Sequence, residues 1–169
     1  MYELEVDIQT ADGLMNTFIT RPEDDRVYPM VLFLMDAPGK REELHDMARR
    51  IATVGYYVML PNLYYRTTRE FVIGPDNREE MFGHMNSLSN AMVCNDIQSM
   101  FDYSSTDSAA GGGAVGCVGY CMSGPYSLAA AARSFCSVYG CPGLQRPGMA
   151  HERAPRAFGT PLSSAVYEN

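Results

Sequence analysis

The stretch Ala114-Val115-Gly116-Cys117-Val118-Gly119-Tyr120-Cys121-Met122-Ser123-Gly124 joins an apolar run to a turn of small residues, and the alanine-rich segment 124–133 follows it. Residues 114–118 have the character of a buried strand, and residues 124–133 that of a helix. A strand that turns straight into a helix at a residue with small neighbours is a nucleophile elbow. We therefore predict that Cys121 lies at the tip of an elbow, in a strained backbone conformation that exposes its thiol.

The predicted position of Cys121 suits a nucleophile. At a helix N-terminus, unpaired backbone N–H groups and the positive end of the helix dipole favour the thiolate. The N–H of Met122 is expected to form half of an oxyanion hole, and the N–H of Ala37 the other half, because Pro38 has no N–H to donate. The alternative is that Cys121 is a small buried residue in a tight turn, as free cysteines often are.

Upstream of this stretch, apolar strand-like runs alternate with a helical pattern. Two runs around Asp12-Gly13 indicate an antiparallel hairpin, and two fully apolar runs on either side of an amphipathic helix indicate a parallel crossover. The fold class predicted is α/β: a mostly parallel sheet with an N-terminal antiparallel hairpin and flanking helices. The expected elements are strands at 2–9, 14–20, 30–35, 56–61 and 114–118, and helices at 40–54, 84–103 and 124–133, with a long loop at 61–83.

The pattern changes near Ser134. Residues 134–169 contain four prolines and no apolar run long enough for a confident strand or helix. The chain is therefore divided into a domain at 1–133 and an irregular tail at 134–169, for which an origin outside the domain's family is one explanation.

Composition excludes several partners. The chain has 169 residues and a formal charge of −7, which argues against nucleic acid or an anionic membrane as a partner. The N-terminus has acidic residues where a signal peptide needs basic and then apolar ones, so a cytoplasmic protein is expected. The five cysteines have no paired spacing typical of zinc sites, and neither a metal nor a cofactor is expected.

Three segments together resemble the dienelactone hydrolase family of α/β-hydrolases. They are Met35-Asp36-Ala37-Pro38-Gly39, Pro61-Asn62-Leu63-Tyr64-Tyr65-Arg66 and Val118-Gly119-Tyr120-Cys121-Met122-Ser123-Gly124, in the family's order and separation. The resemblance runs from near residue 5 to about residue 133. It implies a hydrolase that opens a small lactone or ester through a cysteinyl acyl-enzyme.

The resemblance also implies roles for particular residues. Asp36 corresponds to an acidic residue that interacts with the resting cysteine, although the family often has glutamate there; the alternative is a turn cap. Arg78 lies in the loop from which the family's substrate-carboxylate arginine comes; the alternative is a solvated surface arginine. Tyr64 and Arg66 are expected to shape the rim of the pocket.

The acid and histidine that should follow the elbow are not recognisable. The only later histidine, His151, stands next to Glu152 with no strand-like run before it, while His45 and His84 precede the elbow. The chain therefore looks like an incomplete hydrolase, truncated after the elbow. The alternative function is a catalytically impaired fragment that binds a small molecule or needs a partner chain, with self-association through an incomplete sheet edge.

Overall fold

A computed structural model describes residues 1–111, 113–133 and 137–140. Within these residues, six strands form a single sheet in the order β1-β2-β4-β3-β5-β6. The pairings among β4, β3, β5 and β6 are parallel, whereas β1 and β2 pair antiparallel with each other and β2 pairs antiparallel with β4. The predicted α/β class, with a mostly parallel sheet and an N-terminal hairpin, is confirmed.

The hairpin consists of β1 (Tyr2–Thr10) and β2 (Gly13–Arg21), with β1 at the sheet edge. The turn between them needs Gly13, whose φ of +134° is rarely adopted by other residues. In β1, residues 3–5 are exposed, and from Val6 to Thr10 exposed residues alternate with partly or fully buried ones. β2 is buried along most of its length because it lies between β1 and β4.

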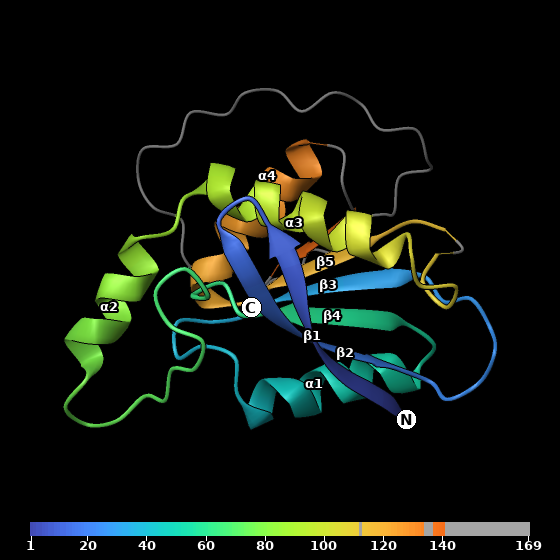
Figure 1. The fold of residues 1–169 in the computed structure, drawn as a ribbon, viewed down its shortest axis with the longest axis horizontal. Helices are drawn as coiled ribbons and strands as arrows, with labels where there is room; N and C mark the ends of the chain where they lie inside the picture. The colour runs from blue at the N-terminus through green and yellow to red at the C-terminus, as the bar shows by residue number, and fades with distance from the viewer. Residues whose placement is uncertain (112, 134–136, 141–169) are drawn as a thin grey trace, which may run out of the picture.

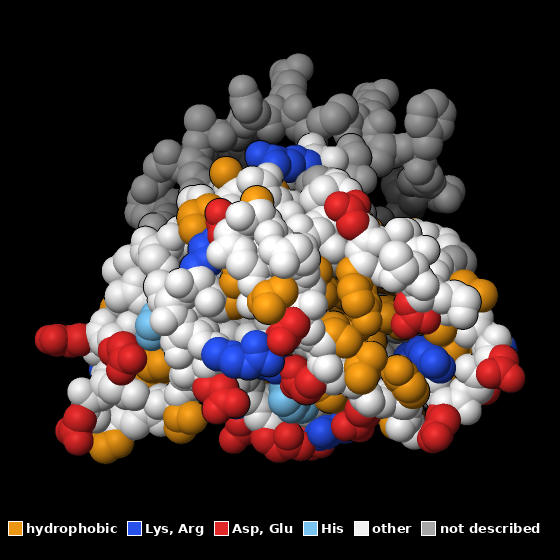
Figure 2. All heavy atoms as spheres, in the orientation of Figure 1, with side chains coloured by type: hydrophobic (Ala, Val, Ile, Leu, Met, Phe, Trp, Pro, Cys, Tyr) orange, Lys and Arg blue, Asp and Glu red, His pale blue; other side chains and the backbone are white. Residues whose placement is uncertain are grey.

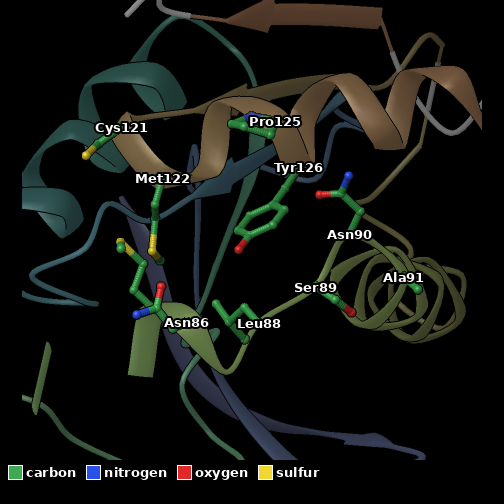
Figure 3. A pocket seen from close by; sticks show the side chains of 10 residues that line it. Asn86, Leu88, Ser89, Asn90, Ala91, Cys121, Met122, Pro125 and Tyr126 are labelled. Atoms are coloured by element: carbon green, nitrogen blue, oxygen red, sulfur yellow. The ribbon is translucent and has the colours of Figure 1, made fainter. Parts of the chain in front are cut away.

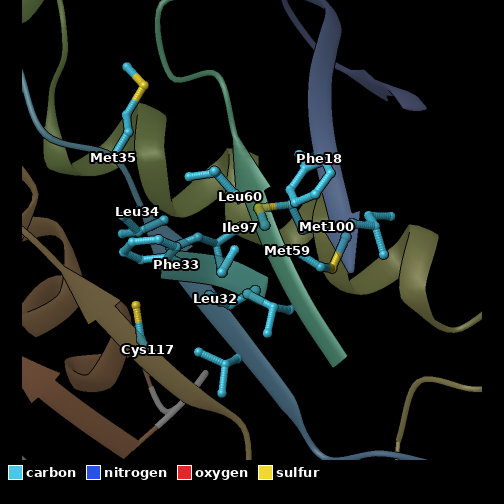
Figure 4. Packing of buried hydrophobic residues seen from close by; sticks show 14 of the residues in the cluster. Phe18, Leu32, Phe33, Leu34, Met35, Met59, Leu60, Ile97, Met100 and Cys117 are labelled. Atoms are coloured by element: carbon cyan, nitrogen blue, oxygen red, sulfur yellow. The ribbon is translucent and has the colours of Figure 1, made fainter. Parts of the chain in front are cut away.

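The parallel strands are β3 (Met30–Leu34), β4 (Tyr57–Pro61), β5 (Gly116–Gly119) and β6 (Ser137–Gly140). Every residue of β3 and β4 is buried, which explains their unbroken apolar sequences. Figure 4 shows Leu32, Phe33 and Leu34 of β3 packed beside Cys117 of β5 and Leu60 of β4. The core of the molecule is therefore centred on β3.

Helices cover both faces of the sheet (Figure 1). One face is covered by α1 (Glu42–Thr53), which buries Leu44, Ala48 and Ala52 and is followed by Gly55, with φ +98°. The other face is covered by α3 (Asn90–Ser104) and α4 (Gly124–Ala132), which pack against each other. None of the helices in the described part of the chain has both the length and the apolar character to span a bilayer. A cytoplasmic location stays a prediction.

Two expectations about the helices and loops were wrong. The segment predicted as one helix over 84–103 is two helices, α2 (Arg78–Asn86) and α3, and α2 begins inside the predicted long loop. The break occurs because Ser89 is an N-cap whose hydroxyl accepts a hydrogen bond from Met92 N–H. α2 has no buried residue, so it lacks the apolar periodicity by which a helix is recognised in a sequence.

The strand β6 was missed. Its four residues lie in the segment predicted to be irregular, where they pair in parallel with β5. So short a strand is specified by its place beside β5 more than by its own sequence. The division of the chain into a hydrolase domain at 1–133 and a tail of separate origin at 134–169 stays a prediction.

The surface carries charges of both signs. On the face shown in Figure 2, acidic side chains lie along the lower rim, interspersed with a few basic ones. Many of the basic side chains belong to ion pairs; Arg49, for example, contacts both Glu3 and Glu42.

Candidate active site

Cys121 stands at the turn between β5 and α4, after Tyr120 and at the start of a short 3₁₀ turn, Cys121–Ser123. Its φ of +51° makes it the one non-glycine residue with positive φ in the described part of the chain. Such strain persists only where the surrounding structure holds it. The side chain is exposed, whereas Cys94 and Cys117 are buried. The backbone thus has the strained elbow that the sequence predicts.

Gly119 makes this sharp turn possible. A Cβ at this position would lie less than 3 Å from the Ser127 hydroxyl and from the backbone of Ser123. The first turn of α4 therefore folds back against the end of β5 at a distance that only glycine permits.

Ser123 fixes the elbow to the neighbouring strand. Its side chain is fully buried, and its hydroxyl donates a hydrogen bond to the carbonyl of Met35, just after β3. Its own carbonyl accepts a hydrogen bond from the Ser127 hydroxyl in α4. A hydroxyl at this position therefore ties together β3, the elbow and α4.

The carboxyl ends of β3, β4 and β5 bring three loop segments together at one edge of the sheet. Tyr64, which follows β4, is buried, and its hydroxyl donates to the Ala37 carbonyl at 2.8 Å and lies 3.3 Å from Met122 Sδ. Burial, and then nearby Tyr126, Asp36 and Cys121, raise the pKa of Tyr64, so its hydroxyl remains a donor. Tyr64 thus lies between the two residues predicted to supply oxyanion donors.

A pocket of about 470 Å³ opens beside the elbow. Figure 3 shows Met122 and Tyr126 on one side of it, with Asn86 and Leu88 on the other. The lining comes from the end of α2, the start of α3 and the elbow: Met85, Asn86, Leu88, Ser89, Asn90, Ala91, Cys121, Met122, Pro125 and Tyr126. Cys121 is therefore one of the residues that line a cavity able to hold a small molecule, although in Figure 3 its sulfur points away from Tyr126.

Among the described residues, the carboxylate of Asp36 makes no hydrogen bond to Cys121. Both of its carboxylate oxygens bind the guanidinium of Arg41, at 2.5 and 3.1 Å. This bond to Asp36 raises the pKa of Arg41. Arg41 is the N-cap residue of α1, five positions along the chain from Asp36. Asp36 thus closes the turn between β3 and α1, which is close to the turn-cap alternative.

The two predicted arginines lie away from the pocket. Arg66 binds Asp96 through two nitrogens at 2.9 and 2.7 Å and also contacts Asp12. Arg78 is exposed at the start of α2, above the ring of Phe82. Neither is among the lining residues. Of the residues predicted to hold or surround substrate, Tyr64 is the one that the structure brings to the elbow.

His84 makes more contacts with other side chains than its position in the sequence indicates. It lies near the end of α2, not at the start of a helix, and stacks on Tyr64 with ring centroids 5.1 Å apart. Its Nδ1 is 2.8 Å from the Thr67 hydroxyl. Neither His84 nor His45 has a hydrogen bond to Cys121, and His151 lies outside the described residues. The sequence signal that could have indicated these contacts is the presence of two aromatic residues, Tyr64 and Phe71, in the segment before His84.

A doubly covered, mostly parallel sheet with a strained cysteine elbow at its carboxyl edge defines an α/β-hydrolase. Residues 15–156 match the model of the dienelactone hydrolase family. The chain therefore belongs to this family. The match continues past residue 133.

Known relatives agree with this assignment. A protein of Methylorubrum extorquens, assigned as a carboxymethylenebutenolidase, is 25% identical over 121 residues, or 71% of this chain. A Klebsiella pneumoniae structure assigned as a dienelactone hydrolase has a TM-score of 0.63 at 22% identity and covers 75% of this chain. A dienelactone hydrolase-like promiscuous phosphotriesterase from metagenomic libraries has a TM-score of 0.71 at 18% identity and covers 88%.

The chain spans only part of each relative. The aligned region covers 41% of the Methylorubrum protein, 54% of the Klebsiella chain and 62% of the phosphotriesterase chain.

Proposed function

We propose that this chain hydrolyses, or at least is acylated by, a small lactone or ester, with Cys121 as the nucleophile. The observation that carries the proposal is the exposed Cys121 thiol at the tip of a strained elbow, on the wall of a pocket. In the first step the Cys121 thiolate attacks the substrate carbonyl, a C–S bond forms, and the C–O bond to the alcohol breaks. The alkoxide takes a proton from solvent; the alcohol of an ester then leaves, whereas that of a lactone stays attached to the acyl group. Water later cleaves the thioester and releases the acid and the thiol.

The proposed oxyanion donors are the N–H groups of Met122 and Ala37. Neither group donates a hydrogen bond to another residue in the described part of the chain. Buried or half-buried N–H groups are nearly always paired in proteins, so two free donors beside the thiol support a role toward a ligand. The Tyr64 hydroxyl donates a hydrogen bond to the Ala37 carbonyl and contacts Met122 Sδ. We propose that these contacts hold Ala37 and Met122 at a fixed separation.

The test is a titration with an activated aryl ester, such as 4-nitrophenyl acetate. Wild-type protein is expected to release one equivalent of 4-nitrophenol in a burst, and the Cys121→Ala variant is expected to release none above background. Cys117→Ala is the matched control, because that thiol is buried in β5 and should leave the burst amplitude unchanged. Equal release by wild type and Cys121→Ala would refute the proposed nucleophile.

A second candidate function is a small-molecule binder, or a subunit that acts with a partner chain. It is favoured by the histidines of the described residues, which contact Phe18, Glu42, Tyr64 and Thr67 and not the thiol. Ligand binding without any Cys121-dependent product would support the binder. A dimer whose mass in sedimentation experiments depends on concentration would support self-association through the sheet edge.

A further inference from the structure

We propose that the pocket beside Cys121 accepts uncharged acyl groups and discriminates against acyl groups that carry a carboxylate. This inference rests on the proposed function and assigns it a substrate class: neutral esters and lactones. It is carried by the chemistry of the lining and by the contacts that hold Arg41 and Arg66 outside it.

The lining provides apolar surface and neutral hydrogen-bonding groups. Met85, Leu88, Ala91, Met122 and Pro125 contribute the apolar part, and Asn86, Ser89, Asn90 and Tyr126 contribute amides and hydroxyls. Among the described lining residues none is an Asp, Glu, Lys, Arg or His, and Cys121, which attacks as a thiolate, would itself repel a carboxylate. A carboxylate entering this space would lose water without gaining a cation, which is costly, whereas an ester oxygen or an alkyl chain would not.

Arg41, Arg66 and Arg78 are not among the residues that line the pocket. Arg41 is held by both oxygens of Asp36, and Arg66 by both oxygens of Asp96. Arg78 lies exposed on α2 over the ring of Phe82. Freeing Arg66 would leave the carboxylate of Asp96, which is 1% exposed, without its partner. These contacts make it unfavourable for Arg41 or Arg66 to turn toward a substrate carboxylate.

The N-terminal ends of two helices at the pocket favour an anionic acyl group, but this effect is weaker than the cost of burying its charge. The start of α3, at Asn90 and Ala91, and the start of α4 both lie at the pocket, and their positive dipole ends favour negative charge. This effect amounts to about two- to fivefold in binding for a charge near a helix end. It is well suited to the transient oxyanion. It is smaller than the penalty for placing a full carboxylate in a site without a cation.

The test compares two 4-nitrophenyl esters of adipic acid, one with the second carboxyl group free and one with it methylated. They differ only in charge and one methyl group. The measured quantity is the second-order rate constant of the burst, after subtraction of the rate with Cys121→Ala. The neutral ester is expected to react at least about tenfold faster. Equal rates, or a faster reaction of the anionic ester, would overturn the inference.

A positive charge added to the pocket should weaken the preference for the neutral ester. Asn86 lines the pocket at the exposed end of α2, so Asn86→Arg can be accommodated at a helix C-terminus. The ratio of anionic to neutral rate is expected to rise at least about fivefold in this variant and to fall again in high salt. The matched control Asn86→Gln changes length without charge and should keep the wild-type ratio. The same change of ratio in both variants would contradict the electrostatic explanation.

A binding measurement separates failure of the inference from failure of the proposed hydrolase. The anilides of the same two acids present the same acyl groups but resist cleavage, and their binding is measured on Cys121→Ala by NMR titration. Tighter binding of the neutral anilide supports the inference even when neither ester gives a Cys121-dependent burst, a result that would refute only the nucleophile. Tighter binding of the anionic anilide overturns the inference whatever the esters do.

Discussion

At the residue scale, the elbow depends on Gly119, and its neighbour Gly124 provides a control. A methyl group at Gly119 would collide with the Ser123 backbone, which cannot move without displacing α4, whereas a methyl group at Gly124 meets nothing within 4 Å. Gly119→Ala is expected to destabilise the protein by about 1–3 kcal/mol and to abolish the burst. Gly124→Ala should be neutral or stabilising, because alanine is the better helix former. Urea denaturation of both variants checks this; equal stabilities would contradict the close packing at Gly119.

Tyr64 is the residue whose hydroxyl should matter for the rate of acylation. Tyr64→Phe removes the bond to the Ala37 carbonyl and the contact with Met122, so the two proposed oxyanion donors are held less firmly. The expected cost is about 1 kcal/mol in unfolding free energy and a slower burst of unchanged amplitude. Stopped-flow measurement of the burst rate tests this.

Tyr65→Phe is the matched control for Tyr64→Phe. Its hydroxyl also makes buried hydrogen bonds, to Thr10 and Asp96, but on the side of the loop away from the elbow. A comparable loss of stability without a change in burst rate is expected. If both variants slowed the burst equally, the effect of Tyr64 would be one of general stability and not of positioning.

His45 should make stability depend on pH. Burial, and then the charge of Lys40, lower the pKa of His45 below 6.5, against the opposing effects of Glu5 and Glu42. Above pH 6.5 the imidazole is neutral in both states. As the pH falls below 6.5, the unfolded chain takes up the proton first, so stability is lost. Wild type should therefore lose more unfolding free energy than His45→Gln between pH 7.5 and 5.5; parallel curves would contradict this.

At the scale of elements, the ion pair of Arg66 with Asp96 joins the loop after β4 to the middle of α3. Burial by itself lowers the pKa of Arg66, but the bonds to Asp96 and Asp12 outweigh it and raise that pKa. Arg66→Met leaves the buried Asp96 carboxylate without its cation and is expected to cost about 3 kcal/mol. Arg50→Gln, which breaks an exposed pair with Asp46 at 3.7 Å, should cost less than about 1 kcal/mol. Urea denaturation distinguishes the two; similar costs would contradict a structural role for Arg66.

The elements that the sequence predicted well are those whose pattern is set by burial. The apolar runs of β3 and β4 and the stripe of α1 follow from contact with one core, and the elbow follows from glycine and small residues at fixed spacing. α2 and β6 were not predicted, because α2 buries no residue and β6 is specified by its pairing with β5. The partners of Asp36 and Arg66 were missed for a similar reason: ion pairs between distant segments leave no periodic signal.

At the scale of the whole molecule, the described residues contain the part of an α/β-hydrolase fold that carries the proposed nucleophile, Cys121. Acylation needs a thiol and oxyanion donors, proposed here on the segments after β3 and β5, and a pocket, which the end of α2, the start of α3 and the elbow line. Deacylation also needs a base to activate water, and in this fold that base follows the elbow. In the described part of the chain no histidine has a hydrogen bond to Cys121. The two steps of the proposed reaction should therefore differ greatly in rate.

The expected kinetic result is a burst of about one equivalent followed by slow turnover. Without a base, the oxyanion donors and the binding energy remain, which in serine proteases still give about 10³–10⁴-fold acceleration over water. Imidazole added to the buffer should speed the second phase and leave the burst amplitude unchanged, because it can act as an external base in an open pocket. His151→Ala checks whether the chain supplies its own base. Fast turnover that is insensitive to imidazole and lost in His151→Ala would show that it does, and would overturn the expected separation of the two steps.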